Sequence, residues 1–261
     1  MEKTIHQKKI LEVALLAGQI MCESNAESYR VEDTMNRILT YSKSAYAVAV
    51  SFSTSIYALL DDPTETNGSY VGIKRITRRS NNLNKISQVN TVSRKLLSGK
   101  ITVDEALTEL QYIRSNKPQY NTFWSSVGVV GLAVSFCVIF GGTTAEVIGS
   151  FINGIVLAFV MHYMDRYLLN EALQNVVQST CVTIGAYLLY TTVLKTADPN
   201  AIIIASLMPM VPGTAITNSL RDIFREDYLA GGARMMEAFF SALMIALGSV
   251  VGLAVMRSVI L

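Results

Sequence analysis

The sequence predicts an α+β cytoplasmic domain, residues 1–121, followed by an all-α membrane bundle of five transmembrane helices, residues 122–261. Charge is the first indication, because 16 of the 22 lysines and arginines and 12 of the 20 acidic residues lie before Asn121. The remainder is mostly apolar and holds its charges in short segments between apolar runs. The third indication is a break at Pro209–Gly213, inside the fourth apolar run. These features predict a charged front joined to a membrane-embedded back.

The N-terminus is expected to stay in the cytoplasm. The opening MEKTIHQKKILEVALL has polar and acidic residues close to its apolar positions and no small-residue cleavage site, so it does not resemble a signal peptide. Three cysteines, Cys22, Cys137 and Cys181, show no CxxC spacing. Neither a disulfide framework nor a metal site is therefore expected.

The front alternates between helical and extended patterns. Apolar residues at helical spacing predict one helix ending near Glu23 and another over 27–41. Residues 46–60 and 70–76 are rich in β-branched and aromatic residues, and Asn67-Gly68 between them is a turn pair, so we expect strands there. Helical periodicity returns over 83–97, and Thr102 with Glu105 forms a capping box that opens a last helix. The predicted order is ααβββαα.

Five spans follow the front. Their predicted ranges are Thr122–Gly142, Glu146–Met161, Leu173–Leu194, Ala201 to about Leu220, and Ala233–Met256. With the front inside, the short cytoplasmic segments hold Arg166, Arg221, Arg225 and Arg234, whereas only Lys195 and Arg257 lie outside. This distribution satisfies the positive-inside rule and places the C-terminus outside.

Small and polar residues mark the helix contacts of the bundle. Ser150-x-x-x-Gly154 and Gly248-x-x-x-Gly252 allow backbones to approach closely, and we expect a partner or a second copy to cover the Gly248/Gly252 face. Polar residues at membrane depth need partners inside the bundle or in a cavity, and they are Asn153, Gln178 and Thr183. Asn153 and Gln178 fit helix association as well as they fit ligand contact.

The broken fourth span is the strongest functional candidate. Pro209 and Pro212 lack an N–H and are expected to free the carbonyls of Ala205 and Met208. Beyond the break Thr214, Asn218 and Asp222 recur at i, i+4 and i+8 and form one polar face. Transporters place such broken helices at their binding sites. The alternative is a kinked structural helix followed by an ordinary cytoplasmic loop.

The sequence gives little support to nucleic-acid binding, catalysis or metal binding. The basic residues Lys74, Arg75, Arg78 and Arg79 lack an aromatic platform or a nucleic-acid motif, so a solvated edge near anionic lipid is favoured over nucleic-acid binding. No GxxxxGK[ST] loop or HExxH motif is present, and the two histidines, His6 and His162, do not favour a catalytic triad. We therefore expect no catalytic residue, cofactor or bound metal.

Two separated motifs carry a family resemblance. The run VPGTAITNSLRD, residues 211–222, with EDYLAGGAR at 226–234 and MEA at 236–238, resembles the signature of the threonine/serine exporter family. The segment LLAGQIMCESNAESYRVEDTM, residues 15–35, resembles that family's cytoplasmic N-terminal motif. The family usually has glycine where Asn25 stands, which indicates a tight left-handed turn at a residue that tolerates it.

The resemblance implies export of small hydrophilic metabolites across the bacterial inner membrane. The substrates implied are threonine and serine, or a dicarboxylate such as succinate in a split branch of the family. Because no second membrane half follows, the chain resembles the larger subunit of the split form, whose smaller all-membrane partner is a separate chain. Hetero- or homo-oligomers are implied.

Site roles follow from the break together with the resemblance. The helix start that follows the Pro212-Gly213 break would present free N–H groups to a substrate carboxylate, since a helix start favours anions. Thr214, Thr217 and Asn218 would hold the polar groups of the substrate. The expected gate consists of Asp222, Arg234 and Glu237, with Arg221 as a fourth member, and one of its acidic residues would carry a coupling proton. A non-transporting regulatory or scaffold subunit and a membrane-anchored hydrolase are the alternatives.

Overall fold

The computed structural model describes residues 2–44, 46–61, 69–77, 79–116, 120–165 and 170–260. The predicted turn at Asn67-Gly68, the basic residues Arg78 and Arg166, and the C-terminal Leu261 lie outside the described residues. By its internal packing the chain divides into two compact units. The first comprises residues 1–117 and 214–235, and the second comprises residues 118–213 and 236–261.

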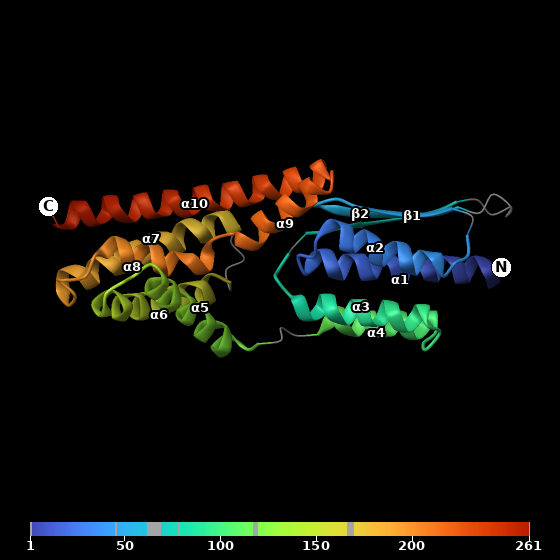
Figure 1. The fold of residues 1–261 in the computed structure, drawn as a ribbon, viewed down its shortest axis with the longest axis horizontal. Helices are drawn as coiled ribbons and strands as arrows, with labels where there is room; N and C mark the ends of the chain where they lie inside the picture. Colours follow the sequence, from blue (N-terminus) through green and yellow to red (C-terminus); the bar gives the residue numbers. More distant parts are fainter. Residues whose placement is uncertain are drawn as a thin grey trace. The chain divides into compact units, whose positions relative to one another are not determined.

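The first unit begins with the order of elements that the sequence predicts. Its described elements in this part are α1 (Glu2–Glu23), α2 (Ser28–Thr40), β1 (Tyr46–Ser51), β2 (Ser55–Asp61), β3 (Tyr70–Arg75), α3 (Leu83–Leu97) and α4 (Val103–Ser115). The strands form one antiparallel sheet in the order β1-β2-β3. Figure 1 shows α1 and α2 as a middle layer, with the sheet on one side and α3 with α4 on the other.

The middle layer is the core of this unit. Apolar residues of α1, among them Ile10, Val13 and Ala17, are fully buried because the sheet and three helices surround that helix. The predicted capping box is present at α4, where Glu105 N donates to Thr102 Oγ1 and Thr102 N donates to the Glu105 carboxylate. Capping satisfies N–H groups that a helix start otherwise leaves without partners.

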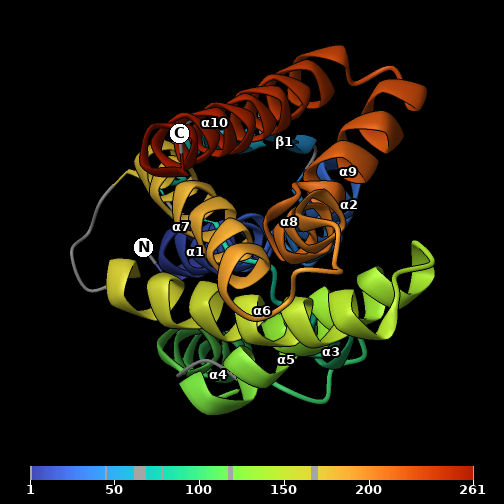
Figure 2. The same cartoon turned by 90° about the vertical axis from the view of Figure 1, so that its left-hand side faces the viewer.

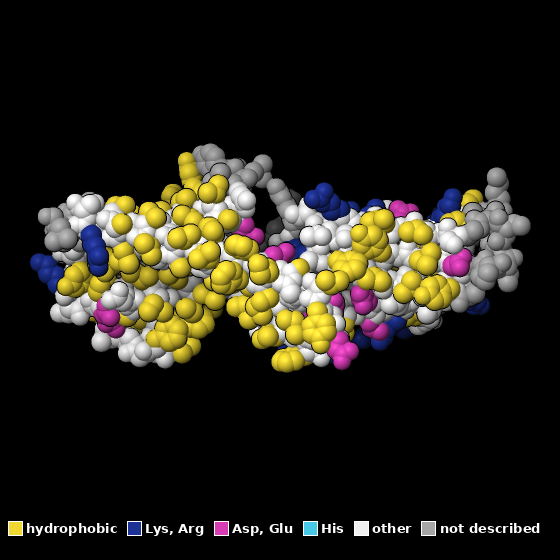
Figure 3. Space-filling view, turned by 90° about the horizontal axis from the view of Figure 1, so that it is seen from above, with side chains coloured by type: hydrophobic (Ala, Val, Ile, Leu, Met, Phe, Trp, Pro, Cys, Tyr) yellow, Lys and Arg dark blue, Asp and Glu magenta, His cyan; other side chains and the backbone are white. Residues whose placement is uncertain are grey.

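The second unit is helical. Its described elements are α5 (Thr122–Ile139), α6 (Thr144–Asp165), α7 (Glu171–Thr192), α8 (Pro199–Leu207), a short 3₁₀ turn (Met208–Met210) and most of α10 (Tyr228–Ile260). Figure 2 shows α7 and α8 side by side next to α6, and each of these three helices packs on the other two. On the face in Figure 3, hydrophobic side chains cover much of α10, as expected for a helix that meets lipid.

Three described helices are long and apolar enough to cross a membrane: α5, α6 and α10. A fourth span results if α8 and α9 (Gly213–Phe224) are counted as one helix that is bent by 57°. The break lies where the sequence predicts it, between Leu207 and Gly213. At 22 residues α7 has the length of a span, but it is more polar than the other three.

The expected loss of backbone hydrogen bonds at the break is wrong. Met208 N donates to Ala205 O, and Val211 N donates to Met208 O at 3.2 Å, so both carbonyls keep a partner. The reason is that the chain tightens into a 3₁₀ turn, in which each N–H reaches the carbonyl three residues back. Gly213 N is also engaged, because it donates to Val211 O at 2.8 Å.

The expectation that a partner or a second copy covers the Gly248/Gly252 face is also wrong. A methyl group at Gly248 would overlap Ser179 and the Val176 carbonyl of α7, and one at Gly252 would overlap Thr183. These glycines therefore bring α7 and α10 of the same chain together, because only glycine lets the two backbones approach so closely. This face is not open to another subunit.

Candidate functional site

The turn between α1 and α2 is the centre of the site. Asn25 has φ 62°, in the left-handed region, as the motif predicts. The segment before α3 continues the turn by backbone hydrogen bonds, with Ser80 N donating to Glu23 O at 2.9 Å and Asn82 N donating to Ser24 O at 3.3 Å. These hydrogen bonds hold the turn, while its Asn25 O, Ala26 O and Ser28 N bind residues of α9 and α10.

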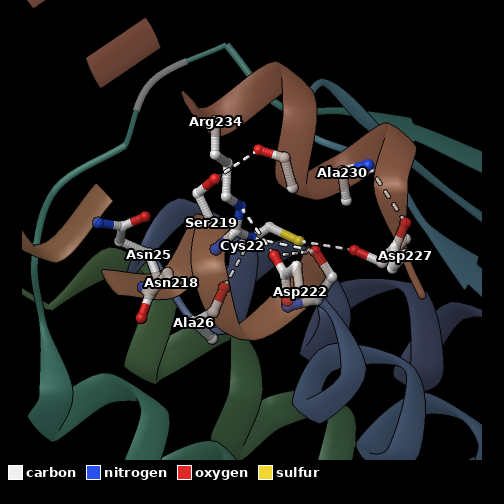
Figure 4. Close-up of polar contacts among 12 residues, drawn as sticks. Cys22, Asn25, Ala26, Asn218, Ser219, Asp222, Asp227, Ala230 and Arg234 are labelled. Carbon is white, nitrogen blue, oxygen red and sulfur yellow. Dashed lines mark hydrogen bonds and ion pairs between the residues drawn. The ribbon is translucent and has the colours of Figure 1, made fainter. Parts of the chain in front are cut away.

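A buried ion pair, Asp222 with Arg234, contacts this turn. The carboxylate of Asp222 accepts hydrogen bonds from Ser28 N at 3.3 Å and from Ser28 Oγ at 3.2 Å. Arg234 Nε lies 3.5 Å from Asp222 Oδ2, and Arg234 Nη2 donates to Ala26 O at 2.8 Å. Figure 4 shows Asp222 and Arg234 converging on the turn from α9 and α10. Their side chains are only 1% and 3% exposed, so each charge depends on the other and on these dipoles.

A polar and aromatic rim surrounds the pair. Arg221 of α9 forms an ion pair with Glu27. Burial by itself would raise the pKa of the Glu27 carboxyl, but hydrogen bonds from Arg221 and Tyr29 outweigh it and hold that pKa below its usual value. The guanidinium of Arg225 lies 3.5 Å from the centre of the Tyr29 ring, within cation–π range.

Two amides and a hydroxyl extend the rim. Asn218 Nδ2 donates to Asn25 O at 3.1 Å, and Thr214 Oγ1 lies 3.1 Å from Asn81 Nδ2. Asn81 in turn accepts from Asn25 Nδ2 at 2.7 Å. We call the α1–α2 turn, residues 24–29, together with its contacts on residues 214–234 the clasp. Its partners are almost 200 residues apart in the chain.

Local sequence explains how α9 and α10 present these groups. Asn218 and Asp222 are four residues apart, so they lie on one face of α9, and Arg225 follows the last residue of that helix, Phe224. The chain then reverses at Glu226, which has φ 66°, and Asp227 Oδ1 caps α10 by accepting from Ala230 N at 3.2 Å.

Close packing then fixes α10 against α9. Ser219 Oγ donates to Gly231 O at 2.7 Å, and a Cβ at Gly231 would lie 2.9 Å from Ser219 O. A side chain at this position would separate the two helices. The glycine in the AGGAR motif therefore serves close helix packing, which positions Arg234 over Asp222.

The structure brings some of the predicted site residues together and separates others. Asp222 and Arg234 form the pair, and Arg221, Thr214 and Asn218 contact the front of the chain. Thr217 is exposed and donates to Thr214 O, and Pro212 lies in the bend before α9. Glu237 is exposed on α10, one turn after Arg234. Sequence reasoning missed Ser28 and the Ala26 carbonyl, which the first motif contains without marking them as ligands of the pair.

A second cluster of polar groups lies inside the second unit. Asn153 of α6 is fully buried, and its Nδ2 donates to Val182 O of α7 at 3.0 Å. Among the described residues of the second unit, three buried side-chain oxygens have no hydrogen-bond partner: Asn153 Oδ1, Ser150 Oγ and Ser206 Oγ. Buried polar groups are nearly always paired, so each of these oxygens calls for an explanation. Ser206 is a residue that the sequence analysis did not single out.

Helix register places these three residues at neighbouring levels of the bundle. Asp198 N donates to Glu146 at 3.0 Å, and a Cβ at Gly149 would contact Ile202, so α6 and α8 advance in the same direction. One further turn brings Asn153 level with Ser206, and Ser150 lies one turn or less away from them. We call Ser150, Asn153 and Ser206 the buried oxygen cluster.

Comparison with known proteins places the chain in a family. The family model described as "Putative threonine/serine exporter" (ThrE) matches residues 12–256. The chain belongs to the threonine/serine exporter family. The resemblance carried by the two motifs is confirmed. Members of the threonine/serine exporter family are transporters rather than enzymes, and the apolar helices agree with a membrane protein.

One curated protein that is similar to the chain is described as an "Uncharacterized protein" from Schizosaccharomyces pombe. It is 22% identical over 191 residues, which are 70% of this chain but only 23% of the relative. The chain therefore spans less than a quarter of that protein's length. No solved structure matches the chain.

The clasp predicts a large difference between its buried and its exposed arginine. Arg234→Met leaves the Asp222 carboxylate buried without its cation, which should cost about 3–5 kcal/mol of stability. Arg221→Met removes a pair whose arginine is 63% exposed, so the expected cost is below about 1 kcal/mol. Thermal unfolding of both purified variants in detergent, followed by far-UV circular dichroism, measures the difference.

A double variant separates the charge effect from the loss of packing. Arg234→Met combined with Asp222→Asn removes both charges, so it should be more stable than Arg234→Met alone. Equal unfolding temperatures for Arg234→Met and Arg221→Met would show that the pair does not hold the turn.

Proposed function

We propose that the chain is an integral membrane subunit of a secondary exporter for small hydrophilic metabolites. Threonine and serine are the first candidates and a dicarboxylate such as succinate the next, with transport coupled to protons. Family membership and the apolar helices support an exporter of the membrane. The observation that carries the proposal is the buried oxygen cluster, because polar groups inside a membrane bundle mark solute and ion pathways.

The proposed path runs through the second unit, beside the break. Asn153 directs its oxygen toward Gly185 of α7, where a Cβ would lie only 2.5 Å away, so the small residue keeps space for this oxygen. Ser206 is the second-last residue of α8, directly before the 3₁₀ turn. A half-helix that ends at a break offers its negative dipole end to cations, and transporters use such ends to bind coupling ions.

We propose five spans with the N-terminus in the cytoplasm and the C-terminus outside. The polar residues that lower the apolarity of α7 include Asn175, Gln178 and Thr183, and all three are buried within the protein. An inward polar face leaves the other side of α7 free to meet lipid. In this topology residues 1–121 form the cytoplasmic domain, and residues 122–261 form the membrane domain of a bacterial inner-membrane protein, except that residues 214–235 pack with the cytoplasmic domain.

In this proposal the clasp is the cytoplasmic gate. It includes Asp222, Arg234 and Arg221, with Glu237 one turn further along α10, and an acidic member would accept the coupling proton. Because Thr214 and Asn218 bind Asn81 and Asn25, the start of α9 is tied to the cytoplasmic domain. Opening the clasp would release α9 and change the bend at Pro212-Gly213. Thr214, Thr217 and Asn218 would then become available to the solute.

A smaller membrane subunit is proposed as the partner. The family resemblance implies a split form, and the Gly248/Gly252 face is already used within this chain. The partner would therefore meet other surfaces, such as the exposed apolar residues of α10. No nucleic acid, metal or cofactor enters the proposal.

Replacing the two serines of the buried oxygen cluster tests whether they line a solute path or belong to a structural core. Ser150→Ala and Ser206→Ala each remove a buried hydroxyl that has no partner among the described residues, so stability should be unchanged or higher. If the solute or its coupling ion uses these oxygens, efflux should fall about tenfold, as expected for the loss of ~1.4 kcal/mol. The measurement is efflux of loaded threonine, serine and succinate from cells, at matched protein abundance.

Ser249→Ala provides the control, because Ser249 Oγ bonds to Ile245 O within α10. Its efflux should equal that of the natural chain. The assay is run with and without the smaller membrane subunit. Normal efflux by both Ser150→Ala and Ser206→Ala would exclude the proposed path, and absence of efflux for every solute in both settings would favour a regulatory or scaffold subunit.

The topology is tested separately by cysteine labelling. In a background without the three natural cysteines, an impermeant thiol reagent applied to intact cells should modify Asp198→Cys and spare Arg166→Cys. The physical reason is the excess of arginine in the segments proposed as cytoplasmic. Modification of both positions from outside would contradict the orientation.

A further inference from the structure

A cavity of about 440 Å³ lies beside the C-terminal end of α1, in the first unit. Its volume is within the range of small-ligand sites. The polar and charged residues that line it include Glu23, Ser24, Arg79, Asn82, Lys85 and Arg114. None of them belongs to the proposed solute path or to the buried ion pair.

Positive charge dominates the walls of this cavity. Three cationic side chains, Arg79, Lys85 and Arg114, share the walls with one carboxylate, Glu23. Arg114 Nη2 lies 3.4 Å from Glu23 Oε1, and both side chains are partly exposed, so this pair is weak. Lys85 Nζ donates to the backbone oxygen of Arg114 at 3.0 Å, which holds its charge at the cavity without neutralising it.

The start of α3 adds to this potential. α3 is 15 residues long, and its N-cap Asn82, which lines the cavity, accepts from Lys85 N at 3.0 Å. The N-terminus of a helix carries a partial positive charge and presents backbone N–H groups. Guanidinium groups, an ammonium group and a helix start together are the usual partners of a phosphate group.

We propose that this cavity binds a phosphate group. The group could belong to a free phosphate-bearing anion or to the headgroup of an anionic lipid, and both present the same oxygens to the same cations. This proposal does not depend on which solute is exported. Phosphate binding can be measured on the protein without any transport assay.

The cavity is connected to the clasp through residues 80–82. Ser80 N and Asn82 N donate to the carbonyls of Glu23 and Ser24, which lead directly into the Asn25 turn. Between these two, Asn81 accepts from Asn25 Nδ2 and donates to Thr214 Oγ1. A phosphate that orders this segment would therefore stabilise the clasp, and the amides of Ser80 and Asn82 should exchange hydrogen more slowly when it is bound.

Calorimetric titration with inorganic phosphate tests the site directly. The full chain is placed in nanodiscs of neutral lipid at low ionic strength, since salt screens exposed charges. Arg79→Met and Lys85→Met should each weaken phosphate binding about tenfold, because each removes a charge-assisted contact. Lys74→Met, which neutralises an exposed lysine of β3 outside the cavity, should leave the affinity within about twofold.

A second arm uses nanodiscs that contain phosphatidylglycerol. If the lipid headgroup occupies the cavity, the apparent phosphate affinity of the natural chain falls there, and if the ligand is a free anion the affinity stays the same. Either result supports a phosphate site and identifies its source. Absence of saturable phosphate binding, or binding that Arg79→Met and Lys85→Met leave unchanged, overturns the proposal.

Discussion

The buried pair of Asp222 and Arg234 is the interaction on which the clasp depends. Taking two charges out of water costs several kcal/mol for each ion, and the cost is offset only when good geometry and further hydrogen bonds accompany the pair. Ser28 donates two of these hydrogen bonds to the carboxylate, and the Ala26 carbonyl accepts one from the guanidinium. The α1–α2 turn must therefore keep its shape for the pair to remain buried, which makes Asn25 and its left-handed conformation part of the same requirement.

This dependence explains why two distant motifs occur in one family signature. The first motif provides the turn, and the second provides α9, the reversal at Glu226 and the start of α10. The two buried charges are compensated only when all of these contacts are present, so weakening one contact leaves the others poorly compensated. Such a network favours two states, one closed and one open. The proposed gate uses this property.

Much of the secondary structure could be predicted from local signals. The capping box of α4 and the break at Pro209–Gly213 follow from residues that are neighbours in the chain. The left-handed Asn25 follows from the family resemblance, since the family usually has glycine at that position. The partners of the clasp could not be predicted, because one sequence does not show that Asn218 and Arg234 reach the turn at residues 25–26. The Gly248/Gly252 face was assigned to a partner for the same reason, since a small-residue face does not identify the helix that packs on it. The carbonyls at the break keep partners because a 3₁₀ turn forms, a local adjustment that proline positions alone do not predict.

The central claim is that export requires the clasp to open, and a reversible cross-link tests it most directly. Tyr29→Cys and Arg225→Cys place thiols on two rim residues of the clasp whose side chains are in contact, since the Arg225 guanidinium lies 3.5 Å from the centre of the Tyr29 ring. In a background without the three natural cysteines, a short bis-methanethiosulfonate reagent joins the two thiols, and mass spectrometry checks the cross-link. Efflux is measured in membrane vesicles with the cross-link in place and again after reduction. The account predicts that the cross-linked protein is blocked and that reduction restores efflux. Full efflux from the cross-linked protein would contradict it.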